Sequence, residues 1–246
     1  MKTNLLQPTL NLAAGVSGAP PRGNRLPLWL KLAYTAFMAV LVPVYWSEYG
    51  PTNFLYFCDV TLFLTLAGLW LEIPLFASMG AVGIVMPQLF WCVDFFVHLA
   101  GGNLTGMTGY MFDPKLPLFL RGLSLFHGWL PFLLLFMVAR LGYDRRALPL
   151  WSLTAWGLIL TCFFLMPRPG AVLANPKAPV NIDYVFGMND VSAQTWMPEW
   201  AWLVLLLTAL PLVVYLPTHL ALKKLCHSPQ PKADSTGTIQ PLENHA

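Results

Sequence analysis

The segment LFASMGAVGIVMPQLFWCVDFFVHL, residues 75–99, decides the class of this protein. It can cross a bilayer as one helix, because a spanning helix needs about 20 predominantly apolar residues. Near its end the run carries Asp94 and His98, which are four residues apart and therefore share one helix face. Ionisable groups inside a membrane are costly and mark candidate functional sites. We therefore take this face as the starting point for a functional site.

The composition of the whole chain agrees with this reading. Hydrophobic residues make up 57% of the 246 residues and charged residues only 10%, and the mean hydropathy is +0.59. A soluble domain carries about 25% charged residues. The composition thus predicts an all-α, polytopic transmembrane helical bundle with no separate soluble domain. The net charge of +3 gives no support for nucleic-acid binding, so membrane lipid is the expected partner, and no protein partner is indicated.

Five further apolar runs flank residues 75–99. Their approximate ranges are 27–46, 53–71, 117–141, 148–166 and 200–222. Each is close to the length of a spanning helix, so about six spans are predicted within residues 26–225. Residues 1–25 and 226–246 are polar and rich in turn-forming residues, which predicts disordered tails. The loop 167–198 is long, and its aromatic and apolar residues predict that it is ordered.

The basic residues orient the predicted bundle. Ten of the 14 Lys and Arg residues fall on the side of the two termini, and only three fall on the opposite side. The group of ten is Lys2, Arg22, Arg25, Lys31, Arg140, Arg145, Arg146, Lys223, Lys224 and Lys232. The positive-inside rule therefore predicts that both termini are cytoplasmic. The expected location is a bacterial inner (plasma) membrane, with several passes.

This orientation places the polar intramembrane residues in the outer half of the bilayer. Asp59 lies about six residues into the second span, or about 9 Å at 1.5 Å per residue. His98 is near the outer surface, and Asp94 lies about one turn below it. The fourth span contributes Arg121, Ser124 and His127 at a similar depth. We predict an outward-facing polar pocket built from these residues.

Within this pocket, His127 is the candidate general base, and Asp94 is its expected principal partner. Three residues of the long loop are candidates for substrate binding above the pocket: Asn181, Asp183 and Tyr184. The candidate catalytic residues are His127, Asp94, His98, Asp59, Ser124, Arg121 and Cys58.

Structural roles remain open for several of these residues. Asp59 and Arg121 are candidates for a buried ion pair that fixes helix register. Ser124 stands between two glycines and is also a candidate for helix packing. His127 has an alternative role as the donor to a backbone carbonyl that Pro131 leaves free.

Three segments carry a resemblance to known membrane proteins. They are NFLYFCD at 53–59, LRGLSLFHGW at 120–129, and the loop from Asn175-Pro176 to the YVFG at 184–187. They resemble segments of bacterial integral membrane proteins of unknown function and, more distantly, of the YwaF-like family. That wider family includes eukaryotic members reported as lipid acyltransferases that use a Cys and a His. The resemblance implies Cys58 as acyl acceptor and His127 as its base. The adjacent Asp59 departs from this scheme, because a carboxylate disfavours a thiolate.

A second resemblance is to the membrane hydrolases that include alkaline ceramidases, in which Ser, Asp and three His surround a zinc ion. Asp94, His98 and His127 are similar in type and would be the metal ligands here, beside Ser124. The paired His motif expected on the last span is absent, since His219 stands alone there. Zinc is the one cofactor that this comparison implies.

Two functional hypotheses follow, and the sequence leaves open whether the protein is an enzyme. In the first, the outer pocket carries out lipid or acyl-group transfer or hydrolysis. In the second, the protein is a carrier or an accessory structural subunit with a buried ion-pair network. The absence of internal repeats in the sequence counts against a carrier, and the absence of a specific catalytic motif counts against an enzyme.

Overall fold

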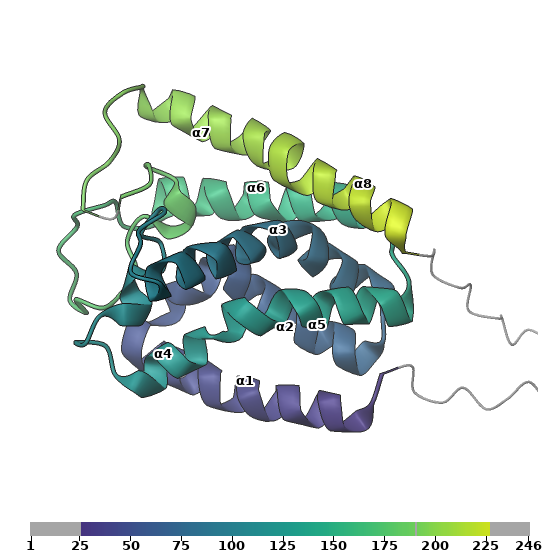
Figure 1. Cartoon of the computed structure of the whole chain (residues 1–246). Coiled ribbons are helices and arrows are strands. Elements are labelled where there is room, and N and C mark those ends of the chain that lie inside the picture. Colours follow the sequence, from purple (N-terminus) through teal and green to yellow (C-terminus); the bar gives the residue numbers. More distant parts are fainter. Residues whose placement is uncertain (1–25, 190, 227–246) are drawn as a thin grey trace, which may run out of the picture.

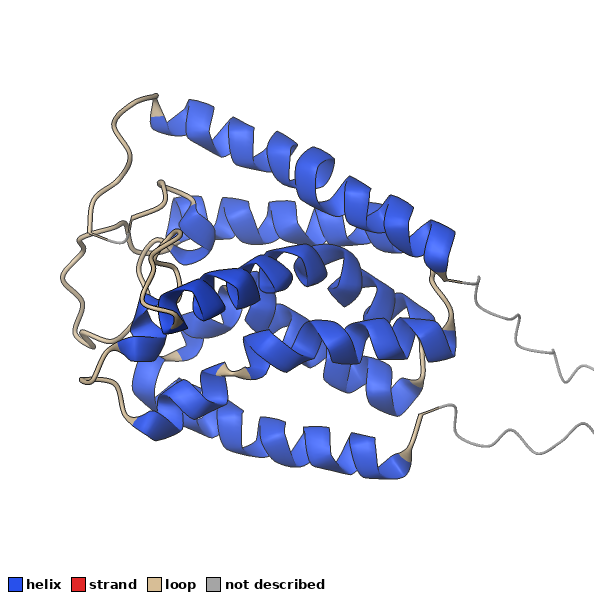
Figure 2. Cartoon of the chain, in the orientation of Figure 1, coloured by secondary structure: helices blue, strands red, loops and turns tan. Residues whose placement is uncertain are grey.

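The computed structural model describes residues 26–189 and 191–226, and every regular element in these ranges is helical (Figure 2). The α-helices are α1 (Leu28–Tyr49), α2 (Phe57–Leu71), α3 (Pro74–Leu99), α4 (Leu118–Ser124), α5 (Phe126–Leu141), α6 (Ala147–Leu165), α7 (Glu199–Ala209) and α8 (Leu216–Leu225). Turns of 3-10 helix form η1 (Pro51–Leu55), η2 (Gly109–Phe112) and η3 (Ile182–Tyr184), and η4 (Leu210–Tyr215) is a π-helix. The predicted all-α class is confirmed. The predicted disordered tails lie outside the described residues, apart from Cys226.

In the described part of the chain, five helical segments are long and apolar enough to cross a membrane. They are Leu28–Tyr49, Pro74–Leu99, Leu118–Leu141, Ala147–Leu165 and Glu199–Leu225. The protein is therefore a multi-pass membrane protein. The predicted second span is shorter than expected, because η1 precedes it and α2 has only 15 residues, or about 22 Å of helix. The start of α1 and the end of α8 lie at the same end of the bundle (Figure 1).

Helix α3 runs through the middle of the bundle, and α2, α5 and α6 pack around it (Figure 1). Its first half is built from small residues and is buried without interruption from Ala77 to Val85. A Cβ atom on Gly83 would lie only 2.1 Å from Cε2 of Trp151, which is fully buried on α6. Gly83 therefore allows the Trp151 ring to lie directly against the backbone of α3.

The last span changes its winding halfway along. It passes from α7 through the π-helix η4 into α8, and Pro211 lies in the π segment. A proline has no N–H to donate, so Pro211 leaves the carbonyl of Leu207 without its helical partner. The indole Nε1 of Trp156 on α6 donates to this carbonyl at 2.8 Å. This hydrogen bond joins α6 to the last span near the point where the α-helix of that span is interrupted.

The long loop 167–198 is ordered, as predicted. Ile182, Val185 and Phe186 are buried in a small apolar cluster with Ile159 and Cys162 of α6 and Leu203 of α7. The side chain of Asn181 organises this turn, because its Nδ2 donates to the carbonyl of Gly187 at 2.8 Å and its Oδ1 accepts from the N–H of Phe186 at 2.9 Å. The loop is therefore packed into the end of the bundle.

Candidate functional site

Asp94 is a loop anchor in this structure. It is 1% exposed, and its Oδ1 accepts from the N–H and the hydroxyl of Thr105, both at 2.7 Å. Its Oδ2 accepts from the N–H of Thr108 at 3.0 Å and from the Thr108 hydroxyl at 2.6 Å. Both oxygens are thus occupied by the loop that follows α3. The expected pairing of Asp94 with His127 is replaced by these four bonds.

His127 also has a backbone partner. Its Nδ1 forms a 2.8 Å hydrogen bond with the carbonyl of Ser124, and its ring stacks on Phe126 at 4.0 Å and on Trp91 at 5.2 Å. The Ser124 carbonyl needs this partner because the helix breaks there: the N–H of Gly128 bonds to Leu125 instead. A backbone bond was one of the expected alternatives for His127, but with a carbonyl that Pro131 frees. The carbonyl that Pro131 frees is that of His127 itself, and it lies 4.0 Å from the thiol of Cys92.

The hydroxyl of Ser124 is used in packing. It donates to the carbonyl of Leu120 at 3.2 Å, so it accepts from the hydroxyl of Tyr45, which lies 2.8 Å away. This bond ties α4 to α1. The geometry of a nucleophile and its base is not formed, because His127 bonds to the carbonyl of Ser124 and not to its hydroxyl.

Arg121 and His98 both hold the turn η2 against the bundle. Nη1 of Arg121 donates to the carbonyl of Met111 at 3.1 Å, and no carboxylate among the described residues forms an ion pair with it. The expected pairing of Arg121 with Asp59 or Asp94 is therefore wrong for this structure. The His98 ring stacks on Phe112 with centroids 4.3 Å apart and planes at 3°.

The zinc hypothesis has no matching geometry. Within residues 26–189 and 191–226, no group of three or more His, Cys, Asp or Glu side chains is arranged to hold a metal ion. The expected ligands are each used elsewhere: Asp94 binds threonines, His98 stacks on Phe112, and His127 binds a carbonyl.

The structure instead brings two carboxylates to the N-terminus of α2. Oδ1 of Asp183 accepts from the N–H of Phe57 at 3.2 Å, across 126 positions of sequence. Asp59 lies in the first turn of the same helix, and its Oδ2 accepts from Nδ2 of Asn53 at 3.4 Å and from the thiol of Cys58 at 3.7 Å. Negative charge at this position is favoured by the helix dipole. The long loop is therefore fastened to α2 by a carboxylate.

Each of these carboxylates keeps one buried oxygen that has no hydrogen-bond partner among residues 26–189 and 191–226. The unpaired atoms are Oδ1 of Asp59 and Oδ2 of Asp183. Burial raises the pKa of Asp183 well above its usual range; the bond from Phe57 lowers it in part, and the charge of Asp59 raises it further. Two carboxylates that interact in this way titrate as a pair.

Two buried polar groups near Phe57 have no hydrogen-bond partner among the described residues apart from each other. They are Nε1 of Trp151 on α6 and the hydroxyl of Tyr215 on η4, both buried. The Trp151 ring contacts the ring of Phe57 at 6.0 Å and that of Tyr215 at 6.3 Å, and Tyr215 is close enough to interact electrostatically with Asp183. The candidate site is thus shared by α2, η3, α6 and η4.

The backbone that carries Asp183 is in an uncommon conformation. Asn181, Asp183 and Tyr184 have positive φ angles of 50°, 55° and 58°. Non-glycine residues in this region each cost about 1–3 kcal/mol, and such strain clusters at ligand clamps and switch regions. Packing of Ile182 and the bonds of Asn181 hold the strained turn in place.

Sequence reasoning identified Asp59, Cys58 and Asp183 but missed Trp151 and Tyr215. Both residues lie in runs that are otherwise apolar, where hydropathy does not single them out. The signal that was available is the pair of prolines at 211 and 217, which flanks Tyr215 and predicts an interrupted helix. Gln88 on α3 was also missed as a site candidate; it is 3% exposed, and its amide has no partner in the described structure.

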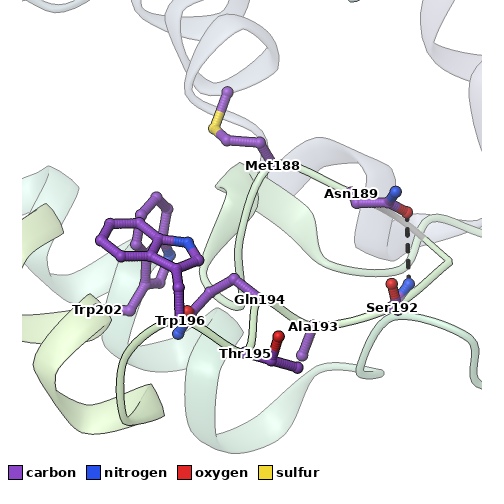
Figure 3. Close-up of a pocket in the computed structure, with 8 residues that line it drawn as sticks. All are labelled: Met188, Asn189, Ser192, Ala193, Gln194, Thr195, Trp196 and Trp202. Atoms are coloured by element: carbon purple, nitrogen blue, oxygen red, sulfur yellow. Dashed lines mark hydrogen bonds between the residues drawn. The ribbon is translucent and has the colours of Figure 1, made fainter.

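A surface hollow of about 440 Å³ lies at the end of the long loop that precedes α7 (Figure 3). Its lining consists of Met188, Asn189, Ser192, Ala193, Gln194, Thr195, Trp196 and Trp202. None of the residues expected to bind substrate lines it. The rings of Trp196 and Trp202 are adjacent, 5.8 Å apart and at 78°, but the amide of Gln194 is occupied by the backbone of Met197. Neither Asp59 nor Asp183 lines the hollow, so it is separate from the buried carboxylate site.

Comparison with known proteins adds no family: the chain matches no protein-family model, no curated protein and no solved structure. The resemblance to the YwaF-like family stays a prediction.

Proposed function

We propose that this membrane protein is a carrier that binds a proton at Asp59 and Asp183. The observation that supports the proposal is the buried, unpaired oxygen on each of the two carboxylates. Two ionised carboxylates held together away from water repel each other and lose hydration. A proton bound by the pair removes one of the two charges.

The surroundings suit a site that gains and loses this proton. When the proton leaves, the new charge needs donors. The candidate donors are Nε1 of Trp151, whose ring contacts Phe57, and the hydroxyl of Tyr215, which interacts electrostatically with Asp183. Tyr215 belongs to a π segment, and such segments occur frequently at functional positions. Discontinuous helices at ion sites are a recurrent feature of carriers.

The depth of the site also fits a carrier. Asp59 lies twelve positions before Leu71, the end of α2, which is about 18 Å at 1.5 Å per residue. With Leu71 at the inner edge of a hydrocarbon core of about 30 Å, this distance places Asp59 inside the core, towards the depth at which carriers bind their coupling ions.

The other hypothesis, lipid or acyl-group transfer or hydrolysis, has less support. It requires His127 to act as a base on the hydroxyl of Ser124 or the thiol of Cys58. The Nδ1 of His127 is instead bonded to a carbonyl, and the thiol of Cys58 points to Asp59. We also propose that the protein resides in a bacterial inner membrane with both termini cytoplasmic, on the basis of its Lys and Arg distribution.

The proton site is tested by infrared difference spectroscopy of the purified protein during a pH titration. We expect a protonated carboxyl signal at neutral pH that disappears at alkaline pH, and we expect Asp59→Asn and Asp183→Asn each to remove or shift it. Asp113→Asn is the matched control, because that carboxylate lies in a loop and bonds only an exposed N–H of Lys115. A wild-type spectrum without a protonated carboxyl at neutral pH would overturn the proton site.

The choice between carrier and enzyme is tested on the phenotype of a deletion strain. Asp59→Asn at normal abundance is expected to fail to complement, whereas His127→Ala at normal abundance is expected to complement. The reverse pattern would favour acyl chemistry at His127 over a proton-linked carrier.

A further inference from the structure

The opposite end of the bundle carries a group of exposed basic side chains. Arg145 lies in the turn between α5 and α6, and Lys223 and Lys224 lie in the last turn of α8. In Figure 1 the connection from α5 to α6 rises beside the end of α8. Cations from two separate elements are thus gathered at one place.

A direct contact holds these two elements together. The hydroxyl of Tyr143 and Nδ1 of His219 form a 2.6 Å hydrogen bond, and their rings are 5.6 Å apart. Lys223 and Arg145 both lie close enough to His219 to act on its ring electrostatically. The two cations therefore converge on one side chain from different helices.

The nearby acids do not neutralise this group. Asp144 is bound by Arg146 at 2.8 Å, and Glu72 is bound by Lys31 at 2.7 Å. In the described part of the chain, no acidic side chain forms an ion pair with Arg145, Lys223 or Lys224. The end of the bundle therefore keeps a local excess of positive charge.

An apolar side chain borders the same group. Leu220, one turn before Lys224 on α8, is 52% exposed. A span with an exposed leucine one turn below exposed lysines presents its apolar part to acyl chains and its charges to headgroups. This arrangement favours an anion that carries hydrocarbon chains over a free inorganic anion.

We propose that Arg145, Lys223 and Lys224 bind the phosphate of an anionic phospholipid, with the acyl chains lying along α8 at Leu220. Basic pockets between spanning helices on the cytoplasmic side suit such headgroups. The bound lipid bridges α8 to the turn that precedes α6, and so reinforces the contact between Tyr143 and His219. This inference does not depend on the proton site.

The test uses the whole protein in nanodiscs of phosphatidylcholine, with or without phosphatidylglycerol, and measures co-purified lipid and thermal unfolding. We expect phosphatidylglycerol to be enriched around the wild-type protein and to raise its unfolding temperature. Arg145→Gln combined with Lys223→Gln should weaken lipid retention about 25-fold, because each cation near a membrane surface contributes about fivefold.

The matched control is Lys115→Gln combined with Lys177→Gln, which removes the same charge at the other end of the bundle. It should retain phosphatidylglycerol as the wild type does. In pure phosphatidylcholine, the double variant at Arg145 and Lys223 should unfold at the same temperature as the wild type, which shows that its folding is intact. A lower unfolding temperature there would overturn the proposal, because it would show a structural role for these residues. Equal retention by the two double variants, or stabilisation of the wild type by inorganic phosphate alone, would also overturn it.

Discussion

The variant Asp94→Asn tests whether Asp94 anchors the loop after α3 or takes part in catalysis. An Asn keeps one oxygen, so one of the two threonines retains its bonds, while the N–H of the other then faces an amide NH₂ group. A hydrogen bond to a charged group contributes about 1.5–3 kcal/mol, and a stranded buried donor costs about 1–3 kcal/mol. The threonine hydroxyl can rotate to accept a bond, so we expect Asp94→Asn to destabilise the protein by about 2–4 kcal/mol.

The assay is thermal unfolding in detergent together with hydrogen exchange of residues 101–108. For a protein of 150–250 residues, 1 kcal/mol corresponds to about 2–4 °C, so the expected fall in Tm is about 4–16 °C. Exchange at Thr105 and Thr108 should accelerate, because the anchor of their N–H groups is weakened. Thr105→Val, which removes one hydroxyl, should cost about 1 kcal/mol.

A different result would refute this reasoning. If Asp94→Asn unfolds and exchanges as the wild type does, and yet abolishes the phenotype of the protein, then Asp94 acts in chemistry and the anchor is incidental. Asp113→Asn is again the control, and it should leave Tm unchanged.

Two further predictions concern the packing of α3 and the titration of the long loop. Gly83→Ala should lower the free energy of unfolding by about 3 kcal/mol or more, and with it Tm and abundance, because its Cβ would lie 2.1 Å from Trp151. Gly157→Ala is the control and should be neutral in the same thermal assay, because its Cβ would meet no atom within 4 Å. Equal Tm values for the two variants would contradict the packing of Trp151 against α3. The raised pKa of Asp183 predicts that the contribution of this carboxyl to stability is greatest below about pH 4, where it is protonated in both the folded and the unfolded state, and falls as pH rises towards the folded pKa. Asp183→Asn should flatten this dependence in thermal unfolding measured across pH, and an unchanged slope would assign the titration to another group.

The spans were predictable because their signal is local. The third span was expected at residues 75–99 and is found at Pro74–Leu99, since an apolar run of spanning length has few alternatives in a bilayer. The order of the long loop was also predicted, because its apolar residues need a buried place. The second span was predicted too long, since Pro51 and its neighbours form a 3-10 turn that hydropathy does not distinguish from α-helix.

The partners of the polar residues were not predictable by the same reasoning. Helix periodicity placed Asp94 and His127 on faces that were expected to meet, and it assumed that the fourth span is one regular helix. The helix breaks at Leu125, and the loop after α3 folds back to cover Asp94. A short loop with threonines competes well for a buried carboxylate, because its N–H and O–H groups need no distant helix to bring them.

The amino-acid sequence was enough to predict a multi-pass helical bundle with ionisable groups inside it, because apolar composition and the cost of buried charge act residue by residue. Which of these groups meet depends on how the helices pack. Asp183 reaches the N–H of Phe57 across 126 positions, and Trp151 lies against Gly83 and contacts the ring of Tyr215. Such contacts depend on how packed helices are rotated and wound, and a shift of one residue around a helix turns a side chain by about 100°. The hydropathy of a segment does not show how its helix is rotated about its axis.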